Sequence, residues 1–280
     1  MQSTCPGLCL YTVRHAMQKD LTDTFQLLAA VGYRGVELFG HRLTHDLSRL
    51  RAAMQLSELT PVSWQVPWQE AADEALPESL LSCGCRTAVV STLFVSHTLP
   101  SRDEWFAQID EINSLADRFA RDGLRLGCHT SAFTFAPCDQ RATYFEFLLS
   151  RLAPGVLIEL DTGNCYQGGM DPCEAIRLCG KRPRYLHMKP YSPNKRFNVV
   201  LGEKEDASGW TSILAADAGH AEQWLIEGAC NSLQEMHVAC LSLDNWRRFL
   251  AQNLQRPASP LPAFSGKASV PAFHDSLSSL

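Results

Sequence analysis

Several sequence features that would define a protein class are missing from this chain. No apolar run reaches the roughly 18 residues that a membrane span needs. The N-terminal residues lack a basic segment followed by a long apolar one, so we expect no signal peptide. No region concentrates basic residues, and the formal net charge is -5, which argues against nucleic-acid binding. We therefore expect a cytoplasmic protein that binds neither a membrane nor nucleic acid.

Two short motifs are also missing. No G-x-G-x-x-G follows the first strand-like run, which argues against a dinucleotide-binding fold. No C-x-x-C pair occurs, which argues against a structural zinc knuckle. The eleven cysteines are odd in number and scattered, and a chain of 280 residues does not need disulfides to fold. We expect reduced thiols, most of them small core residues.

Short apolar runs alternate with amphipathic segments along most of the chain. Eight strand-like runs are expected at 7–13, 35–39, 60–66, 87–92, 124–130, 156–162, 185–189 and 223–228. Helices are expected at 21–33, near 47–54, and at 68–81, 101–123, 140–152, 171–180, 209–219 and 233–254. Eight strand–helix pairs predict an α/β protein with a (β/α)8 TIM barrel over 1–254. A doubly wound open sheet is the alternative, because periodicity does not show closure.

The ends of two predicted helices carry clear signals. Ser101 and Glu104 have the spacing of a capping box at the start of 101–123. Asp171 and Pro172 are typical of a helix start, and Gly180 of a helix end. The last segment, 255–280, is rich in Pro, Ser and Ala, and we expect a flexible or loosely docked tail.

Polar residues recur where the predicted strands end, and in a (β/α)8 barrel these ends build the active site. They are Glu37, His129, Asp161, His187, Lys189 and Glu227. Carboxylates and an imidazole from neighbouring strands suit a divalent metal ion. Structural roles are equally open at this stage: Glu37 could pair with Arg14, and Asp161 could cap a following helix through its "DTGN" turn.

The order of several segments resembles the sugar phosphate isomerase/epimerase family of xylose-isomerase-like TIM barrels. The resemblance extends over about 7–250 and includes "LAAVGYRGVELFG", "GLRLGCHTSAFTF", "IELDTGNCYQGGMDP" and "YLHMKPYS". It implies a divalent metal at the barrel mouth, one of Mn, Mg, Co, Fe or Zn. By resemblance, Asp161 of "LDTGN", His187 of "HMK" and Glu227 after the last strand are the metal ligands, and Lys189 faces the substrate.

One motif departs from the family pattern. Where many relatives read like "YHNHDFEF", this chain reads "CHTSAFTF", so that His129 is kept while Ser131 and Thr134 replace a His and a Glu. Pro190 replaces an acid that usually follows the "HxK" motif, and no carboxylate appears after the fifth strand until Asp139. His129 could therefore serve as a fourth metal ligand or as a base.

The resemblance implies a metal-dependent isomerase or epimerase that acts on a sugar, keto-sugar or polyol through an enediolate. Glu227 or His129 would move the proton, and Lys189 would stabilise negative charge. Because one acid is missing, a dehydratase or lyase acting on a keto-sugar or cyclic polyol is an alternative, as is an inactive barrel that binds a partner. An endonuclease is disfavoured by the net charge of -5. A homo-oligomer is possible for such barrels.

Overall fold

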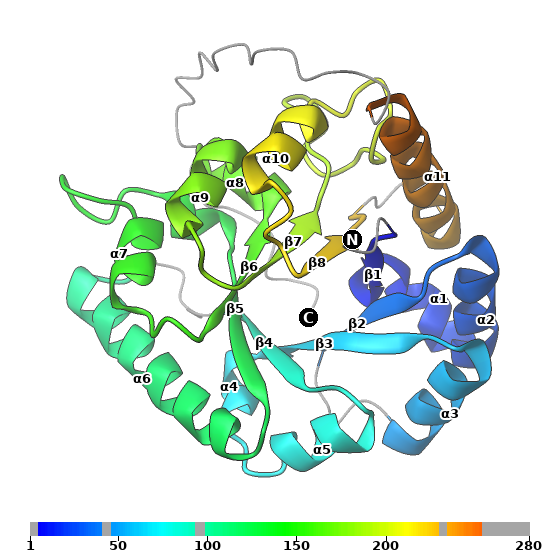
Figure 1. Cartoon of the computed structure of the whole chain (residues 1–280), viewed down its shortest axis with the longest axis horizontal. Helices are drawn as coiled ribbons and strands as arrows, with labels where there is room; N and C mark the ends of the chain where they lie inside the picture. Colours follow the sequence, from blue (N-terminus) through cyan, green and yellow to red (C-terminus); the bar gives the residue numbers. More distant parts are fainter. Residues whose placement is uncertain (1–4, 41–45, 93–98, 230–233, 254–280) are drawn as a thin grey trace.

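Eight parallel strands close into a barrel, with helices around its outside (Figure 1). This computed structural model describes residues 5–40, 46–92, 99–229 and 234–253. Each strand pairs with the next, and β1 pairs with β8, which excludes the open sheet. The strands are β1 Gly7–Cys9, β2 Gly35–Phe39, β3 Thr60–Pro67, β4 Thr87–Thr92, β5 Arg125–His129, β6 Leu157–Asp161, β7 Arg184–Met188 and β8 Gln223–Ile226.

The helices surround the strands and cover their outer face (Figure 1). They are α1 Arg14–Lys19, α2 Leu21–Val31, α3 Leu47–Ser57, α4 Trp68–Ala71, α5 Leu76–Ser82, α6 Arg102–Arg121, α7 Tyr144–Arg151, α8 Thr162–Gly168, α9 Pro172–Cys179, α10 Trp210–Asp217 and α11 Glu235–Asn253, with short 3-10 helices η1 Leu10–Val13 and η3 Ala132–Phe135. None of the described helices has the length and apolarity that a membrane crossing needs.

The predicted helix caps are present. Ser101 and Glu104 form the capping box of α6, and the Asp171 side chain accepts a hydrogen bond from the first turn of α9. The prediction of a single helix over 68–81 is wrong, because the segment divides into α4 and α5. The Asp73 side chain accepts a hydrogen bond from Ala75 N, which stabilises a turn, and Pro77 then lies in the first turn of α5.

The interior of the barrel has an apolar floor. Val89, Leu157, Tyr185 and Leu225 form a buried cluster of their own, separate from the main core. Gly127 of β5 makes room for it, because a Cβ there would lie 2.8 Å from Leu157 Cδ2. These side chains fill the interior below the C-terminal ends of the strands, so the barrel is a packed core with a closed base.

The main core lies between the sheet and the helices, and its largest fully buried aromatic side chains are Trp64, Trp105, Tyr33, Phe25, Phe119 and Phe145. The described cysteines are all free thiols and most are buried, as the sequence predicted. Cys230 and the predicted tail, 255–280, lie outside the described residues, as do 41–45 and 93–98, which follow β2 and β4.

Candidate active site at the C-terminal ends of the strands

Above the apolar floor, the barrel interior becomes polar and charged. Each of the six strand-end residues singled out in the sequence lies here and is buried: Glu37, His129, Asp161, His187, Lys189 and Glu227. Parallel pairing aligns Asp161 of β6 with His187 of β7, and Cys9 of β1 with Glu37 of β2. Because alternate residues of a strand face the same side, Glu159 joins Asp161 in the interior. We refer to these residues, with Glu159, as the charged layer.

His187 lies between two carboxylates. Its Nδ1 is 2.8 Å from Glu227 Oε2, and its Nε2 is 2.8 Å from Glu37 Oε1. Both ring nitrogens can donate only when the imidazole is protonated. Burial by itself would lower the pKa of His187, but the carboxylates of Glu159 and Glu37 outweigh it and raise that pKa well above its ordinary value. With these partners His187 is therefore an imidazolium held on two sides.

The Lys189 ammonium contacts two acids of the charged layer, Glu227 and Asp161. Its Nζ lies 2.7 Å from Glu227 Oε1 and 3.3 Å from Asp161 Oδ2. Burial lowers the pKa of Lys189, yet Asp161 and Glu227 raise it above its ordinary value overall. Burial alone would raise the pKa of Glu227, but Lys189 and His187 hold it well below its usual range. Lys189 is thus bonded to acids of the site, whereas the sequence predicted that it faces the substrate.

Asp161 has two different roles. One oxygen, Oδ1, accepts a hydrogen bond of 2.8 Å from Asn164 N and caps α8, as the "DTGN" turn suggested. The other oxygen, Oδ2, faces Lys189 Nζ and lies 3.8 Å from His129 Nε2. Burial raises the pKa of Asp161, although Lys189 opposes this shift. The capping role of Asp161 is therefore confirmed, and its role as a metal ligand stays a prediction.

His129 is oriented from below by Glu159. Its Nδ1 is 3.1 Å from Glu159 Oε2, an oxygen that also accepts a hydrogen bond from Gln65 Nε2 at 2.9 Å. Since that oxygen is an acceptor, Nδ1 is the donor, and Nε2 is left facing Asp161. The Asn164 amide lies 3.4 Å from Nε2. A carboxylate behind an imidazole in this way is the usual support of a metal-binding histidine.

Glu37 and Glu159 are two buried acids that influence each other. Burial, and then the charge of Glu159, raise the pKa of Glu37 from 4.5 to about 8. Burial would also raise the pKa of Glu159, but His187 and His129 lower it well below its ordinary value. Two like charges in a low-dielectric interior do not both ionise readily, so Glu37 is the first acid of this pair to take up a proton as the pH falls. Ser63 donates a hydrogen bond of 2.6 Å to Glu37 Oε2.

Several of these partners were missed in the sequence. Glu159 stands two residues before Asp161, so the alternation of "IELD" could have placed it in the interior. Ser63 and Gln65 alternate in the same way in β3, but polar residues inside a strand gave no sign of their partners. The suggested pair of Glu37 with Arg14 is wrong, because Arg14 contacts Tyr11 O at 2.9 Å and Glu235 Oε1 at 3.6 Å.

The residues of the departing motif lie beside this site and add no acid to it. The hydroxyls of Ser131 and Thr134 are 3.4 Å apart in and before η3. Asp139 lies in a turn, where its side chain accepts hydrogen bonds from Arg141 N and Ala142 N and faces Arg102 at 3.5 Å. Among the described residues after β5, Thr134 therefore stands where the family pattern has an acid, and His129 is the titratable group that β5 brings to the site.

The charged layer has the donors that a divalent cation needs. Among the described residues, three groups place one ligand atom each within 4.8 Å of one another, and His187 belongs to all three. The groups are His129–Asp161–His187, Glu37–Glu159–His187 and Cys9–His187–Glu227. Asp161 and Glu227 fall in different groups, with the Lys189 ammonium between their side chains. The predicted ligands Asp161 and Glu227 are thus close to each other, but the Lys189 ammonium lies between their carboxylates.

Charge and hydrogen bonding both fit a cation here. Glu37, Glu159, Asp161 and Glu227 bring four buried carboxyl groups, against the two cations His187 and Lys189. When all four acids are ionised, an excess of negative charge remains that is costly to bury without a further cation. In addition, Glu159 Oε1 is buried and accepts no hydrogen bond from the described residues, although His187 Nε2 is 3.4 Å away.

The thiol of Cys9 borders the same site. Cys9 is buried in β1 and belongs to one of the three ligand groups, with His187 and Glu227. Burial and the charge of Glu37 raise the pKa of this thiol well above its ordinary value. Without a metal ion beside it, Cys9 is therefore a protonated thiol in the wall of the site.

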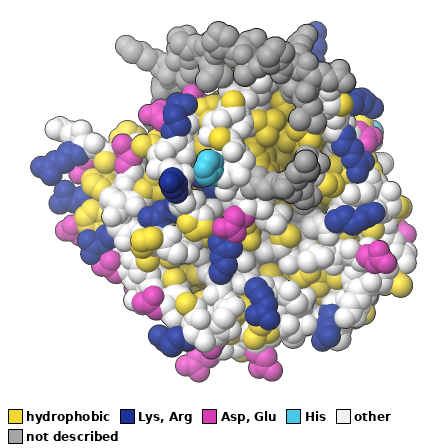
Figure 2. All heavy atoms as spheres, viewed as in Figure 1, with side chains coloured by type: hydrophobic (Ala, Val, Ile, Leu, Met, Phe, Trp, Pro, Cys, Tyr) yellow, Lys and Arg dark blue, Asp and Glu magenta, His cyan; other side chains and the backbone are white. Residues whose placement is uncertain are grey.

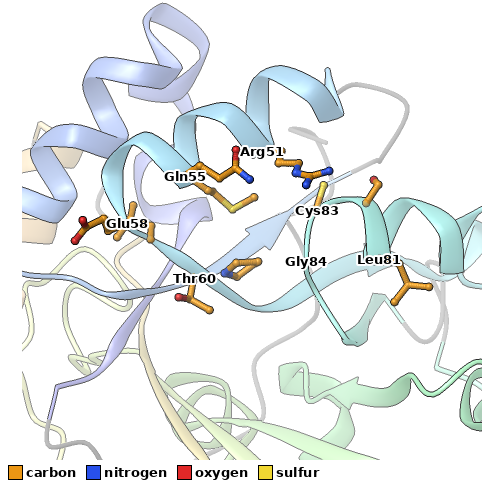
Figure 3. A pocket seen from close by; sticks show the side chains of 11 residues that line it. Arg51, Gln55, Glu58, Thr60, Leu81, Cys83 and Gly84 are labelled. Atoms are coloured by element: carbon orange, nitrogen blue, oxygen red, sulfur yellow. The ribbon is translucent and has the colours of Figure 1, made fainter.

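A surface pocket of about 450 Å³ lies elsewhere, between α3 and α5 (Figure 3). Arg51, Glu58, Thr60 and Cys83 are among its lining residues. Thr60 begins β3, so the pocket lies at the N-terminal ends of the strands, away from the charged layer. The exterior in Figure 2 shows positive and negative side chains interspersed. Active sites of (β/α)8 barrels lie at the C-terminal ends, so the charged layer is the candidate site.

Comparisons with known proteins identify solved structures that have a similar fold. No protein-family model and no curated protein matches this sequence. Solved structures do match. A sugar phosphate isomerase/epimerase from Parabacteroides distasonis is 18% identical, with a TM-score of 0.71 over 85% of this chain and 92% of that chain. The probable 3-DHS dehydratase AsbF from Bacillus anthracis is 15% identical, with a TM-score of 0.66 over 90% and 99%.

A D-psicose 3-epimerase from Clostridium cellulolyticum is 13% identical, with a TM-score of 0.60 over 82% of this chain and 94% of that chain. At such identities the likeness concerns the fold. The chain has the xylose-isomerase-like TIM barrel fold, which confirms the architecture that the sequence predicted. The similar structures include isomerases, epimerases and a dehydratase, so the fold itself does not choose among these reactions.

Proposed function

We propose that this protein is a divalent-metal-dependent isomerase or epimerase acting on a sugar, keto-sugar or polyol. The observation that supports it best is the charged layer itself. Carboxylates and imidazoles from β2, β5, β6 and β7, with Glu227 after β8, are buried together at the C-terminal end of the barrel. Such a concentration of acids is unfavourable for stability, and it is expected where a cation is bound.

The residues that would hold the metal are Asp161, His187 and Glu227, as the resemblance implies. His129 is the best candidate for a further ligand, because its Nε2 faces Asp161. Two imidazoles with carboxylates suit Mn, Co, Fe or Zn, and Mg remains a candidate. When bound, such a metal polarises the oxygens of a carbonyl or hydroxyl group of the substrate.

The protein's own groups then have distinct tasks. Glu227 is ionised at neutral pH, because Lys189 and His187 lower its pKa. Loss of its contact with Lys189 would make it a stronger base, able to accept a proton from a carbon next to a carbonyl. Lys189, beside it, can stabilise negative charge on a substrate oxygen. His129 offers a second nitrogen for proton transfer from the β5 side. Glu37 and Glu159 lie beneath the two imidazoles and fix their orientation.

A dehydratase or lyase acting on a keto-sugar or cyclic polyol is the second candidate. It is favoured by the lack of a second acid on the β5 side, since Ser131 and Thr134 bring only hydroxyls and Asp139 points elsewhere. Such a step needs one base and a leaving hydroxyl, whereas epimerisation is usually served by two bases. An inactive barrel that binds a partner is a third candidate, and the bond of Lys189 to two expected ligands favours it.

The other expectations stay predictions. We propose a small-molecule substrate, a cytoplasmic location and no membrane or nucleic-acid partner. A homo-oligomer remains open to measurement by light scattering of the purified full chain.

The reaction can be tested with a panel of ketoses, cyclic keto-polyols and their phosphates in D2O. We expect NMR to show deuterium entering at a carbon next to the carbonyl, only when a divalent metal is present. Appearance of the C-epimer or aldose would identify the isomerase, and appearance of a conjugated, ultraviolet-absorbing product would identify the dehydratase. Full turnover by chelator-treated protein would contradict a metal-dependent reaction, and no exchange with any compound would favour the inactive barrel.

A further inference from the structure

The position of the Lys189 ammonium raises a question that the proposed function leaves open. Its Nζ contacts Glu227 Oε1 at 2.7 Å and Asp161 Oδ2 at 3.3 Å. These are two of the three residues expected to hold the metal, and they come from different strands. An ammonium between two buried carboxylates supplies the positive charge that a metal would supply. The Lys189 ammonium therefore supplies the positive charge between Asp161 and Glu227 that a bound metal would otherwise supply.

We propose that Lys189 is an internal counter-ion of this site, which holds Asp161 and Glu227 ready in the metal-free protein and is displaced from them when a metal binds. The inference rests on the proposed metal site, and it adds that metal and ammonium compete for the same two carboxylates. Lys189 is in this respect a positioning residue, whatever contact it makes with a substrate.

Bond lengths show why both cations do not fit in contact with these oxygens. Protein carboxylates bind divalent transition metals at about 2.0–2.2 Å, which is much shorter than the contacts of the ammonium. A metal would draw Asp161 and Glu227 closer together than they are around Lys189. An ammonium left in place would then lie next to a dication, where repulsion in a buried site is strong. Metal binding consequently requires that Nζ move away.

The surroundings define how Lys189 is held and where its ammonium can go. Its backbone N donates to Thr162 Oγ1 at 3.2 Å, and its stem passes so close to Gly163 that a Cβ there would lie 3.0 Å from Lys189 Cγ. The stem is therefore fixed by packing, whereas the ammonium is held by its contacts with Glu227 and Asp161. Nζ already lies 4.6 Å from the centre of the Phe197 ring, a face that attracts cations. Withdrawal towards Phe197 would keep the charge stabilised.

The arrangement also gives a reason for a lysine at this position. In the metal-free protein it neutralises acids that would otherwise repel each other, so the site is preserved without metal. Once displaced, the ammonium is released from its acids and becomes available to an oxygen of the substrate. Metal binding would thereby place Lys189 in the role that the sequence predicted, facing the substrate.

The test is a comparison of Mn2+ binding by full-length wild type, Lys189→Met and Lys189→Arg, with calorimetry at one fixed pH. We expect Lys189→Met to bind Mn2+ at least about tenfold more tightly, because the competing cation is gone. Lys189→Arg keeps the charge and should remain close to wild type. The matched control is Lys195→Met, which removes a lysine of the same loop that is exposed and pairs with Glu205 at 3.0 Å.

Thermal unfolding gives a second readout that a purely structural lysine would not produce. In chelator, Lys189→Met should have a lower Tm than wild type, because two buried carboxylates lose their counter-ion. With saturating Mn2+ this deficit should shrink or reverse. Should Lys189→Met not fold, Lys189→Gln removes the charge with a polar side chain and is measured in the same way.

The outcomes separate this inference from the proposed function. If wild type binds Mn2+ and Lys189→Met binds it equally or more weakly, the inference is wrong and the metal site stands. If wild type binds no metal and Lys189→Met does, the ammonium excludes the metal and is not displaced by it, so both the displacement and the proposed metal-dependent function are wrong. If neither binds metal, both proposals are wrong.

Discussion

The barrel interior contains two layers that the same eight strands build in opposite ways. The floor, made of Val89, Leu157, Tyr185 and Leu225, is apolar and closed. The charged layer begins two residues further along each strand, at the next side chain that faces the interior. In β6 this step leads from Leu157 to Glu159, and in β7 from Tyr185 to His187. Both layers are buried, so burial does not distinguish them. Their chemistry does: the floor stabilises the fold, whereas the charged layer is costly to the fold, and the proposed function would account for it.

The largest effect is expected from removing the imidazole at the centre of the charged layer. His187→Ala leaves Glu37, Glu159 and Glu227 without their shared cation, and loss of one partner in a buried ion pair costs about 3–5 kcal/mol. We expect urea unfolding to show a loss of that size in chelator, and calorimetry to show no Mn2+ binding. Retention of Mn2+ binding by a folded His187→Ala protein would contradict the assignment of His187 as a ligand.

A change in the floor should separate stability from metal binding. Leu157→Ala opens a cavity in the apolar cluster, and such truncations cost about 2–5 kcal/mol. We expect a lower urea midpoint with an Mn2+ affinity within about threefold of wild type, since the ligands lie in the other layer. A comparable loss of affinity in Leu157→Ala would show that the two layers are not independent.

The pH dependence of stability should report the buried acid pair. The pKa of Glu37 is raised from 4.5 to about 8 in the folded protein, so between these values the folded state binds more protons than the unfolded state. Stability of the metal-free protein should therefore fall as the pH rises from about 4.5 to 8. His187, whose pKa is also raised, adds to the fall above its ordinary value.

Glu37→Gln removes the acid and should flatten this decline. The measurement is urea unfolding in chelator at pH 5, 6, 7 and 8, for wild type and variant side by side. Below pH 4.5 the opposite trend is expected, because the lowered pKa values of Glu159 and Glu227 make stability fall as these acids take up protons. Identical slopes in wild type and Glu37→Gln would remove Glu37 as the cause.

The smallest effect is expected for an exposed ion pair outside the barrel interior. Arg125 and Glu222 make two hydrogen bonds of 2.6 and 3.0 Å at the surface, where water screens their charges. Glu222→Ala should cost less than about 1 kcal/mol in urea unfolding and leave Mn2+ binding unchanged. A larger loss would mean that surface charge, as well as the charged layer, contributes substantially to stability.

The sequence predicted the architecture well and the site only in outline. Strand and helix periodicity placed all eight strands, because each is a short apolar run between helix signals. Only Gly7–Cys9 of the predicted run 7–13 is a strand, however, and Leu10–Val13 forms a 3-10 helix. The break between α4 and α5 was missed, since one Asp73 turn is a weak local signal beside a helical pattern. The strand-end rule found Glu37, His129, Asp161, His187, Lys189 and Glu227, because the fold brings these ends together.

What the sequence did not give is the pairing of these side chains. That Glu159 supports His129, and that Lys189 lies between Asp161 and Glu227, depends on the register of neighbouring strands and on rotamers. The sequence of one strand determines neither its register with the next strand nor the rotamers of its side chains. The suggested pair of Arg14 with Glu37 was wrong for the same reason. Two charged residues that follow neighbouring strands do not have to contact each other.

The central claim is that the charged layer binds one divalent cation through Asp161, His187 and Glu227. The most direct measurement is equilibrium dialysis of chelator-stripped protein against Mn2+, with metal counted by mass spectrometry, for wild type and for Asp161→Asn with His187→Asn. The account predicts about one ion per chain in wild type and none in the folded double variant. No uptake by wild type, or equal uptake by both proteins, would contradict it.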